Sequence, residues 1–242
     1  MNSRQSSVAV AAAVAVVALP LLSRAPRRVL LGPSTPLDFN LACACGKVKA
    51  AVHAPDPLSL VCHCDDCRDY VLWCGQHANP PCAPRGGDPG DGVRTCQVFK
   101  ADIRVNEPAQ LQWSVLDPSL VPPDRPFTLL RAHATCCNTP LFNTWRELPT
   151  CSFFAPAVVE DGGSGAASLL QPPQWRLNVQ FAQKAPTVTA SCGTAQLFGF
   201  RFLARFMARN LVYYRSRAVP APFALPESLE ACVVRQRAEA TQ

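Results

Sequence analysis

The sequence predicts a mainly β fold of short antiparallel strands, and three observations support this prediction. The 242 residues are 48% hydrophobic and 17% charged, which provides a core and excludes a disordered chain. The 24 prolines are about twice the usual ~5% share and interrupt most potential helices. Beyond residue 36, apolar segments are short and separated by turn residues. One domain with terminal attachments fits this length.

Seven strand-like segments follow one another along the chain. Segment 47–53 alternates imperfectly, 58–61 is a brief apolar run, and 151–159 is interrupted by Pro156. The other four segments are 95–105, 111–116, 127–133 and 139–143. Between them, residues 79–92 are so rich in Pro and Gly that we expect a surface excursion without chemistry.

The first 37 residues are typical of a targeting segment that precedes a domain at 38–160. Their apolar run spans 15 residues, from 8 to 22, and is shorter than the roughly 18 that indicate a spanning helix. Arg4 precedes the run and a basic stretch follows it. We favour a transit peptide for an organellar matrix, in the mitochondrion or plastid. A secretory peptide and a retained membrane anchor are the alternatives.

The C-terminal part is predicted to be a linker at 161–173 and an extension at 174–242. Residues 195–217 predict a basic amphipathic helix, because phenylalanines recur every four residues and arginines follow the adjoining stripe. In one interpretation the aromatic face packs on the domain while the arginines meet solvent. In the other, the helix binds a partner or a membrane surface.

The distribution of charge argues against a nucleic-acid partner. The formal net charge is +6, but four arginines precede the first acidic residue, Asp38. The remaining chain carries 19 basic and 17 acidic side chains. Its net charge is therefore much smaller than the basic excess that is typical of a nucleic-acid-binding domain.

Seven of the 13 cysteines lie in three clusters, which predict metal binding in a reducing compartment. Thiolates two positions apart in a turn can face one ion, and a third thiolate three positions further can complete a tripod. Zinc accepts such tetrahedral sulfur ligands. Disulfides or small buried hydrophobes are the alternative. The candidate ligands are Cys43, Cys45, Cys62, Cys64, Cys67, Cys136 and Cys137.

Residues 41–143 resemble the glutathione-dependent formaldehyde-activating enzyme family, which includes the centromere protein V group. The resemblance depends on three motifs in the family's order: Cys43-x-Cys45-Gly46-x-Val48, then Cys62-His63-Cys64-x-x-Cys67-Arg68, then Cys137-x-Thr139-Pro140-Leu141. The adjacent Cys136-Cys137 pair, the late basic helix and residues 217–223 look more like a functionally uncharacterised branch of this superfamily.

The resemblance implies a β-tent of antiparallel sheets around two Zn²⁺ sites. Cys43, Cys45 and Cys137 would belong to a closed structural site. The second zinc would be held by the middle motif, through Cys62, Cys64 and Cys67. Its fourth position would stay open for water or a substrate thiol. The implied reaction makes or breaks a carbon–sulfur bond in an adduct of a small thiol such as glutathione.

Three residues beside the second motif are candidates for proton transfer. A zinc with an exchangeable ligand lowers the pKa of bound thiol or water, and a nearby acid or base helps to move the proton. His63, Asp65 and Asp66 are in position to do so, although aspartates in a tight turn commonly cap backbone N–H groups instead.

The chain departs from the family pattern in its last motif. Ala134 stands where the first cysteine of that motif belongs, and Cys136 is next to Cys137 instead. In one alternative, Cys136 and Cys137 both bind the structural zinc. In the other, Cys136 is the fourth ligand of the second zinc, and His133 is the fourth ligand of the structural zinc. Asn138 replaces the usual glycine, and asparagine tolerates the left-handed turn conformation.

Two classes of function follow. One is a zinc-dependent enzyme, similar to carbon–sulfur lyases, that acts on a small thiol or its adduct. The other is a non-catalytic zinc-stabilised module that binds a partner or membrane surface. The sequence predicts neither the thiol nor an oligomeric state.

Overall fold

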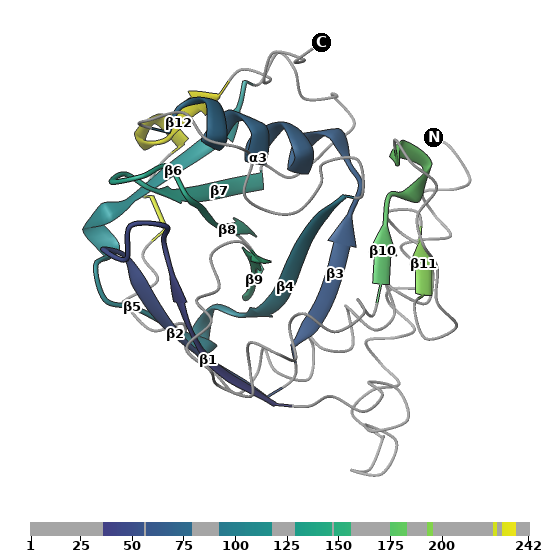
Figure 1. The fold of residues 1–242 in the computed structure, drawn as a ribbon, viewed down its shortest axis with the longest axis horizontal. Coiled ribbons are helices and arrows are strands. Elements are labelled where there is room, and N and C mark those ends of the chain that lie inside the picture. The colour runs from purple at the N-terminus through teal and green to yellow at the C-terminus, as the bar shows by residue number, and fades with distance from the viewer. Residues whose placement is uncertain are drawn as a thin grey trace, which may run out of the picture.

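Two β-sheets form the body of the protein in the computed structural model (Figure 1). The structure describes residues 36–55, 57–78, 92–117, 129–146, 148–155, 175–182, 193–195, 225–226 and 229–235. The smaller sheet has the strand order β1-β2-β5, and the larger sheet has the order β11-β10-β3-β4-β9-β8-β7-β6-β12. The prediction of a mainly β fold is therefore confirmed.

Most of the predicted strands are present; segment 111–116 keeps its predicted bounds, and the others have altered ends. The strands are β1 (Leu37–Ala42), β2 (Lys49–Ala54), β3 (Leu58–Cys62), β4 (Val93–Phe99), β5 (Ile103–Val105), β6 (Leu111–Leu116), β7 (Leu129–Ala134), β8 (Pro140–Trp145), β9 (Thr150–Phe154), β10 (Trp175–Leu177), β11 (Gly193–Ala195) and β12 (Val233–Arg235). Strand β1 begins where we placed the end of the targeting segment. It pairs antiparallel with β2, with Phe39 opposite Val52.

The predicted strand 95–105 is two strands in different sheets. Strand β4 ends at Phe99, and a short 3₁₀ turn, η3 (Lys100–Asp102), carries the chain across to β5 in the smaller sheet. The backbone N–H of Lys100 donates to the carbonyl of Pro149 at 2.8 Å, and its ammonium donates to the carbonyl of Trp145 at 2.9 Å. These bonds hold the turn in place, and nothing in the apolar pattern of the segment indicates it.

The larger sheet is mixed rather than purely antiparallel. The consecutive pairs from β3 to β6 in the sheet order are antiparallel, as predicted. Strand β10 pairs parallel with β3 and with β11, and β12 pairs parallel with β6. These strands come from the C-terminal part of the chain, which returns to both edges of the sheet. Long connections of this kind permit parallel pairing.

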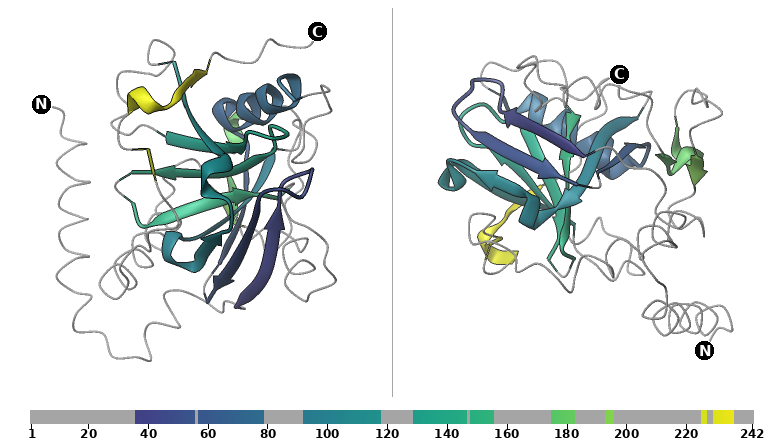
Figure 2. Two further views of the ribbon diagram at one scale, coloured as in Figure 1. Left: turned by 90° about the vertical axis from the view of Figure 1, so that its left-hand side faces the viewer. Right: turned by 90° about the horizontal axis from the view of Figure 1, so that it is seen from below.

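The smaller sheet packs on the central strands of the larger one (Figure 2). Buried side chains of both sheets form one core, which includes Leu41, Val52 and Ile103 from the smaller sheet. The rings of Phe39 and Phe153 pack across this interface with centroids 5.1 Å apart. The ends of the strands around this core carry the cysteine clusters.

Helix α3 (Asp65–Gln76) was not predicted from the sequence. It buries Cys67, Tyr70, Val71 and Cys74, which follow the i, i+3, i+4, i+7 spacing of one helix face. That face packs with Val93 of β4 and with other large-sheet side chains. Two aspartates in its first turn stabilise the helix, because their negative charges lie at the positive end of the helix dipole. One of the buried positions, Cys67, had been predicted as a metal ligand in a turn, and this obscured the helical pattern.

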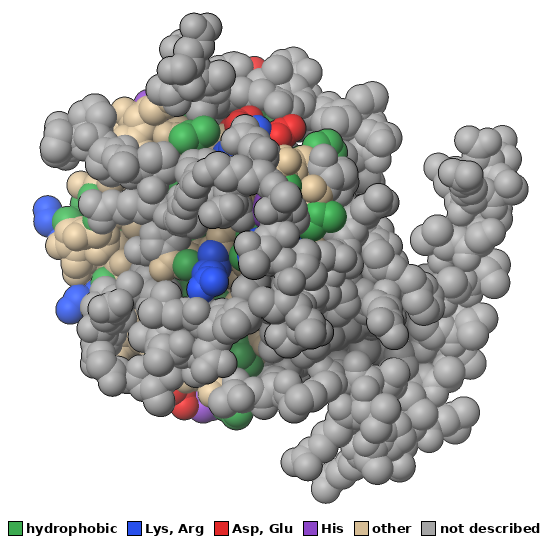
Figure 3. Space-filling view, turned by 45° about the vertical axis from the view of Figure 1, so that its right-hand side comes forward, with side chains coloured by type: hydrophobic (Ala, Val, Ile, Leu, Met, Phe, Trp, Pro, Cys, Tyr) green, Lys and Arg blue, Asp and Glu red, His purple; other side chains and the backbone are tan. Residues whose placement is uncertain are grey.

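Several predictions concern parts of the chain outside the described residues. These are the targeting segment up to residue 35, most of the excursion at 79–92, the linker at 161–173 and the helix from residue 196 onwards. None of the described helices is long and apolar enough to cross a membrane. On the face in Figure 3, the described Lys and Arg side chains form separate small patches, one of them beside acidic side chains.

Candidate metal centre

Cys43 and Cys45 lie in the tight turn between β1 and β2. The N–H of Gly46 donates to the carbonyl of Cys43 at 2.9 Å, and the N–H of Cys43 donates to the carbonyl of Val48 at 2.9 Å. Gly46 has φ +74°, which glycine adopts without strain. The turn thereby directs both thiols to the same side.

Cys136 and Cys137 lie in the turn between β7 and β8. The carbonyl of Ala134 accepts the N–H of Asn138 at 2.8 Å, and Asn138 takes the left-handed conformation with φ 50°. The hydroxyl of Thr139 accepts the N–H of Ala44 at 2.9 Å and thus joins this turn to the first one. Packing of the smaller sheet on the larger one therefore brings together two motifs that are more than 90 residues apart.

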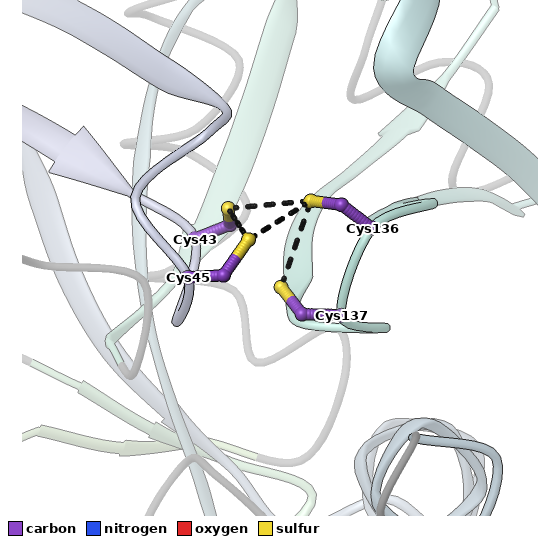
Figure 4. A group of neighbouring side chains, drawn as sticks. All are labelled: Cys43, Cys45, Cys136 and Cys137. Atoms are coloured by element: carbon purple, nitrogen blue, oxygen red, sulfur yellow. Dashed lines mark hydrogen bonds between the residues drawn. The ribbon is translucent and has the colours of Figure 1, made fainter.

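The four thiols of these turns face one another, as Figure 4 shows, and we call them the four-cysteine cluster. The sulfur–sulfur distances are 3.5 Å for Cys43–Cys45, 3.7 Å for Cys43–Cys136, 3.2 Å for Cys45–Cys136 and 3.8 Å for Cys136–Cys137. A tetrahedral zinc with bonds of about 2.3 Å to sulfur separates its ligands by about 3.8 Å. The donor set fits zinc after small movements.

The thiols of this cluster differ in acidity. Burial opposes the ionisation of Cys137, but hydrogen bonds from Thr139 and from the backbone of Cys45 outweigh it and lower the pKa to about 6. Burial raises the pKa of Cys43 and of Cys136. Cys137 therefore ionises before Cys43 and Cys136 in the metal-free protein, and a cation is needed to hold several thiolates together.

Cys62, Cys64 and Cys67 form a second group, the three-cysteine cluster, at the end of β3 and the start of α3. Their sulfur atoms all lie within 4.8 Å of one another, and those of Cys62 and Cys64 are 3.3 Å apart. Cys64 is the N-cap of α3, so this cluster lies at the positive end of the helix dipole, where thiolates are stabilised. Within the described part of the chain, no fourth Cys, His, Asp or Glu completes this group.

Arg131 of β7 lies beside the three-cysteine cluster and is 1% exposed. Its Nη2 donates to Oδ2 of Asp66 at 2.7 Å and lies 3.6 Å from the sulfur of Cys67. Its guanidinium is also 5.1 Å from the ring centre of Tyr70. Although burial opposes its charge, Asp66 and Cys67 keep the pKa of Arg131 well above the ordinary value. The cluster therefore has a permanent buried cation on one side.

The same cation and the neighbouring thiols set the ionisation of the cluster. Hydrogen bonds from Cys62 and Cys64, followed by Arg131, lower the pKa of Cys67 well below the ordinary value of a thiol. A hydrogen bond from Cys64 opposes the shift at Cys62, but Cys67 and burial raise that pKa to about 12. Contacts with the other two thiols and burial also raise the pKa of Cys64. A metal ion is required for all three to be thiolates at neutral pH.

Asn178 reaches the cluster from a segment that we had assigned to the C-terminal extension. Strand β10 pairs with β3, and the carbonyl of Leu177 accepts the N–H of His63 at 3.0 Å. Asn178, which is 3% exposed, then donates its Nδ2–H to the sulfur of Cys62 at 3.4 Å. Neither Asn178 nor Arg131 was predicted from the sequence as part of a site. An arginine at an inward-facing strand position is the only sequence signal for Arg131, and we find none for Asn178.

The three predicted acid–base candidates have different surroundings. Asp65 is 41% exposed and accepts a hydrogen bond from Arg68 at 2.6 Å. Asp66 is 13% exposed and paired with Arg131. His63 is buried, and its ring lies so close to Gly92 that a Cβ there would be 2.8 Å from Nδ1. Asp65 and Asp66 lie in the first turn of a helix rather than in a tight turn.

The structure also separates the alternatives for Cys136. Cys136 lies in the four-cysteine cluster and does not close the three-cysteine cluster. Ala134, at the position of the absent cysteine, is buried in the core and holds the turn through its carbonyl. His133 packs edge-on against Trp73 at 5.3 Å between ring centres, and burial lowers its pKa to about 4. His133 is in neither cluster.

The fold and these two groups define a mainly β protein with two cysteine clusters that can hold metal ions. All 11 cysteines in the described part of the chain are free thiols. Comparison with protein-family models finds no match, and comparison with curated proteins finds none at the required significance.

Proposed function

We propose that this is a zinc protein, similar to the glutathione-dependent formaldehyde-activating enzymes, that forms or cleaves carbon–sulfur bonds in adducts of a small thiol. The observation that carries this proposal is the unequal number of sulfur ligands in the two clusters. Four thiolates complete the tetrahedral coordination that zinc takes in structural sites, whereas three thiolates leave one position. The four-cysteine cluster is then structural and the three-cysteine cluster is the reactive site.

Zinc in the three-cysteine cluster would supply Lewis acidity and lower the pKa of a bound thiol or water. The protein's own part is to hold three thiolates in a buried setting. The dipole of α3 and the guanidinium of Arg131 both favour negative charge at Cys67. Because Asp66 is paired with Arg131, we propose that its carboxylate balances the positive charge of the guanidinium. Asp65, which is 41% exposed, is then the better placed group for proton transfer to solvent.

The motif resemblance supports the same proposal. The two-sheet architecture is compatible with a β-tent, and the first and last motifs of the chain meet in the four-cysteine cluster. Free thiols in every described cysteine are compatible with the proposed organellar matrix, where thiols stay reduced. The basic helix at 195–217, with its partner or membrane surface, remains a prediction.

The test is native mass spectrometry of the full chain, which counts zinc before and after addition of glutathione with formaldehyde. We expect two zinc ions and a retained thiol adduct. Cys64→Ser should remove one zinc ion and the adduct while leaving the fold, whereas Cys45→Ser should lower thermal stability strongly, because a structural zinc contributes directly to folding. Two zinc ions and no adduct under any condition would support the non-catalytic module instead.

A further inference from the structure

The three thiols of the three-cysteine cluster receive different numbers of hydrogen bonds. The sulfur of Cys62 accepts the side-chain N–H of Asn178 at 3.4 Å and also a hydrogen bond from the backbone of Cys64. The sulfur of Cys67 faces the guanidinium of Arg131, with Nη2 at 3.6 Å. Two of the three sulfurs therefore have nitrogen donors supplied by distant parts of the fold.

Cys64 is the exception. Its sulfur contacts that of Cys62 at 3.3 Å, and no N–H group of the described residues donates to it. Cys64 and Cys62 are both partly exposed, whereas Cys67 is buried, so the absence of an N–H donor is what distinguishes Cys64 from Cys62. As the N-cap of α3, Cys64 lies between the end of β3 and the first turn of the helix.

This asymmetry affects chemical reactivity, since the nucleophile is the thiolate lone pair. A hydrogen bond to a ligand sulfur draws electron density from that lone pair, which is how proteins tune metal–thiolate centres. A metal thiolate without such a bond keeps its electron density and reacts faster with a soft carbon electrophile. Partial exposure adds access for the reagent.

We propose that Cys64 is a modification site for uncharged carbon electrophiles, and that Asn178 and Arg131 protect Cys62 and Cys67 from the same reaction. The chemical class is an electron-poor alkene such as an α,β-unsaturated carbonyl compound. The proposal rests on the metal-loaded three-cysteine cluster of the proposed function, but it does not require the carbon–sulfur lyase reaction.

The reaction is a conjugate addition and needs no oxidant. The lone pair of the Cys64 sulfur forms a bond to the β-carbon of the alkene, and the π electrons of the alkene move to the α-carbon. The α-carbon then takes a proton from water. The product is a thioether at Cys64, which is a poorer ligand than the thiolate that it replaces.

The experiment treats the zinc-loaded full chain with less than one equivalent of N-ethylmaleimide and locates the label by peptide fragmentation. Trypsin cleaves after Lys49 and Arg68, so all three cysteines lie on one peptide, 50–68, and can be compared directly. We expect label at Cys64 in at least about tenfold excess over Cys62 and Cys67, the lower end of effects ascribed to groups that hydrogen-bond to metal ligands. Equal labelling, or label mainly at Cys62 or Cys67, overturns the proposal.

Asn178→Gly tests the origin of the selectivity. Asn178 has φ 58°, which glycine adopts without strain, so the variant removes the amide and preserves the backbone. We expect label at Cys62 to rise several-fold relative to Cys64. The matched control is Asn138→Gly, because Asn138 is also left-handed, with φ 50°, but donates to a carbonyl rather than to sulfur. Its labelling pattern should equal that of the unmodified sequence.

The outcomes separate this proposal from the proposed function. Zinc is counted before labelling, so a three-cysteine cluster without zinc contradicts both. A protein with two zinc ions and no thiol adduct contradicts only the lyase reaction, and labelling at Cys64 still supports the present proposal. An unchanged ratio in a folded, zinc-loaded Asn178→Gly variant overturns it. If that variant does not fold, the order of labelling in the unmodified sequence decides.

Discussion

The side-chain amide of Asn138 donates a hydrogen bond to the backbone carbonyl of His77 and thereby joins the β7–β8 turn to the C-terminal end of α3. That turn carries two members of the four-cysteine cluster, while the first turn of α3 carries Cys64 and Cys67. Trp73 of the same helix packs edge-on against His133 of β7, with ring centres 5.3 Å apart, and adds a second contact between the helix and this strand. One helix therefore carries Cys67 of the three-cysteine cluster and is hydrogen-bonded to the turn that carries Cys136 and Cys137.

We predict that the amide of Asn138 stabilises the protein. Asn138→Gly keeps the left-handed backbone and removes the hydrogen bond, which should lower the free energy of unfolding by about 0.5–1.5 kcal/mol. Asn138→Val should cost about 1–3 kcal/mol more, since a β-branched residue is strained at φ 50°. Urea unfolding of the zinc-loaded protein, followed by tryptophan fluorescence, measures both. Equal stability of the two variants would contradict the backbone argument.

We predict that the buried ion pair between Asp66 and Arg131 is sensitive to the loss of one partner. Asp66→Asn leaves the guanidinium, which is 1% exposed, without its carboxylate, so the free energy of unfolding should fall by about 3–5 kcal/mol. Chemical unfolding and zinc content, measured on the same samples, show whether the three-cysteine cluster survives this change.

The neighbouring residue provides the control. Asp65 is also in the first turn of α3 and also pairs with an arginine, but its side chain is 41% exposed. Asp65→Asn should cost at most about 1 kcal/mol, because exposed ion pairs are screened by solvent. A similar loss for both aspartates would mean that the helix dipole, rather than the buried pair, accounts for the effect.

We predict a pH-dependent contribution from His133. Burial, with a smaller effect of His77, lowers its folded pKa to about 4, against about 6.5 in the unfolded chain. Between these values the unfolded chain binds the extra proton, so stability rises with pH from about 4 to 6.5. The contribution, about 3 kcal/mol, is complete above pH 6.5 and is lost as pH falls through the folded pKa.

His133→Phe isolates this contribution, because phenylalanine keeps an aromatic contact with Trp73 and has no titrating group. The cysteines titrate in both proteins, so the difference between the two stability curves reports His133. We expect that difference to change across pH 4–6.5 and to be constant above it. Parallel curves over the whole range would refute the prediction.

Much of the sheet was predictable because strand signals are local. Segment 111–116 is predicted from its own residues, and it forms β6 with those bounds. The break within 95–105 was not predictable, since the turn at Lys100 depends on carbonyls near residues 145 and 149. Helix α3 was not predicted because its first buried position, Cys67, belongs to a motif that predicted metal ligands in a turn.

The sequence by itself determined the kind of site, because cysteine spacing within a single turn limits which thiols can face one ion. It also determined the short strands, through their apolar segments and the prolines between them. Only the tertiary structure decided which motifs meet. The sulfurs of Cys45 and Cys136 approach to 3.2 Å across 91 positions. Arg131 of β7 and Asn178, the residue that follows β10, reach the other cluster. Such contacts follow from strand order and register, which are set by packing of the whole chain rather than by any one segment.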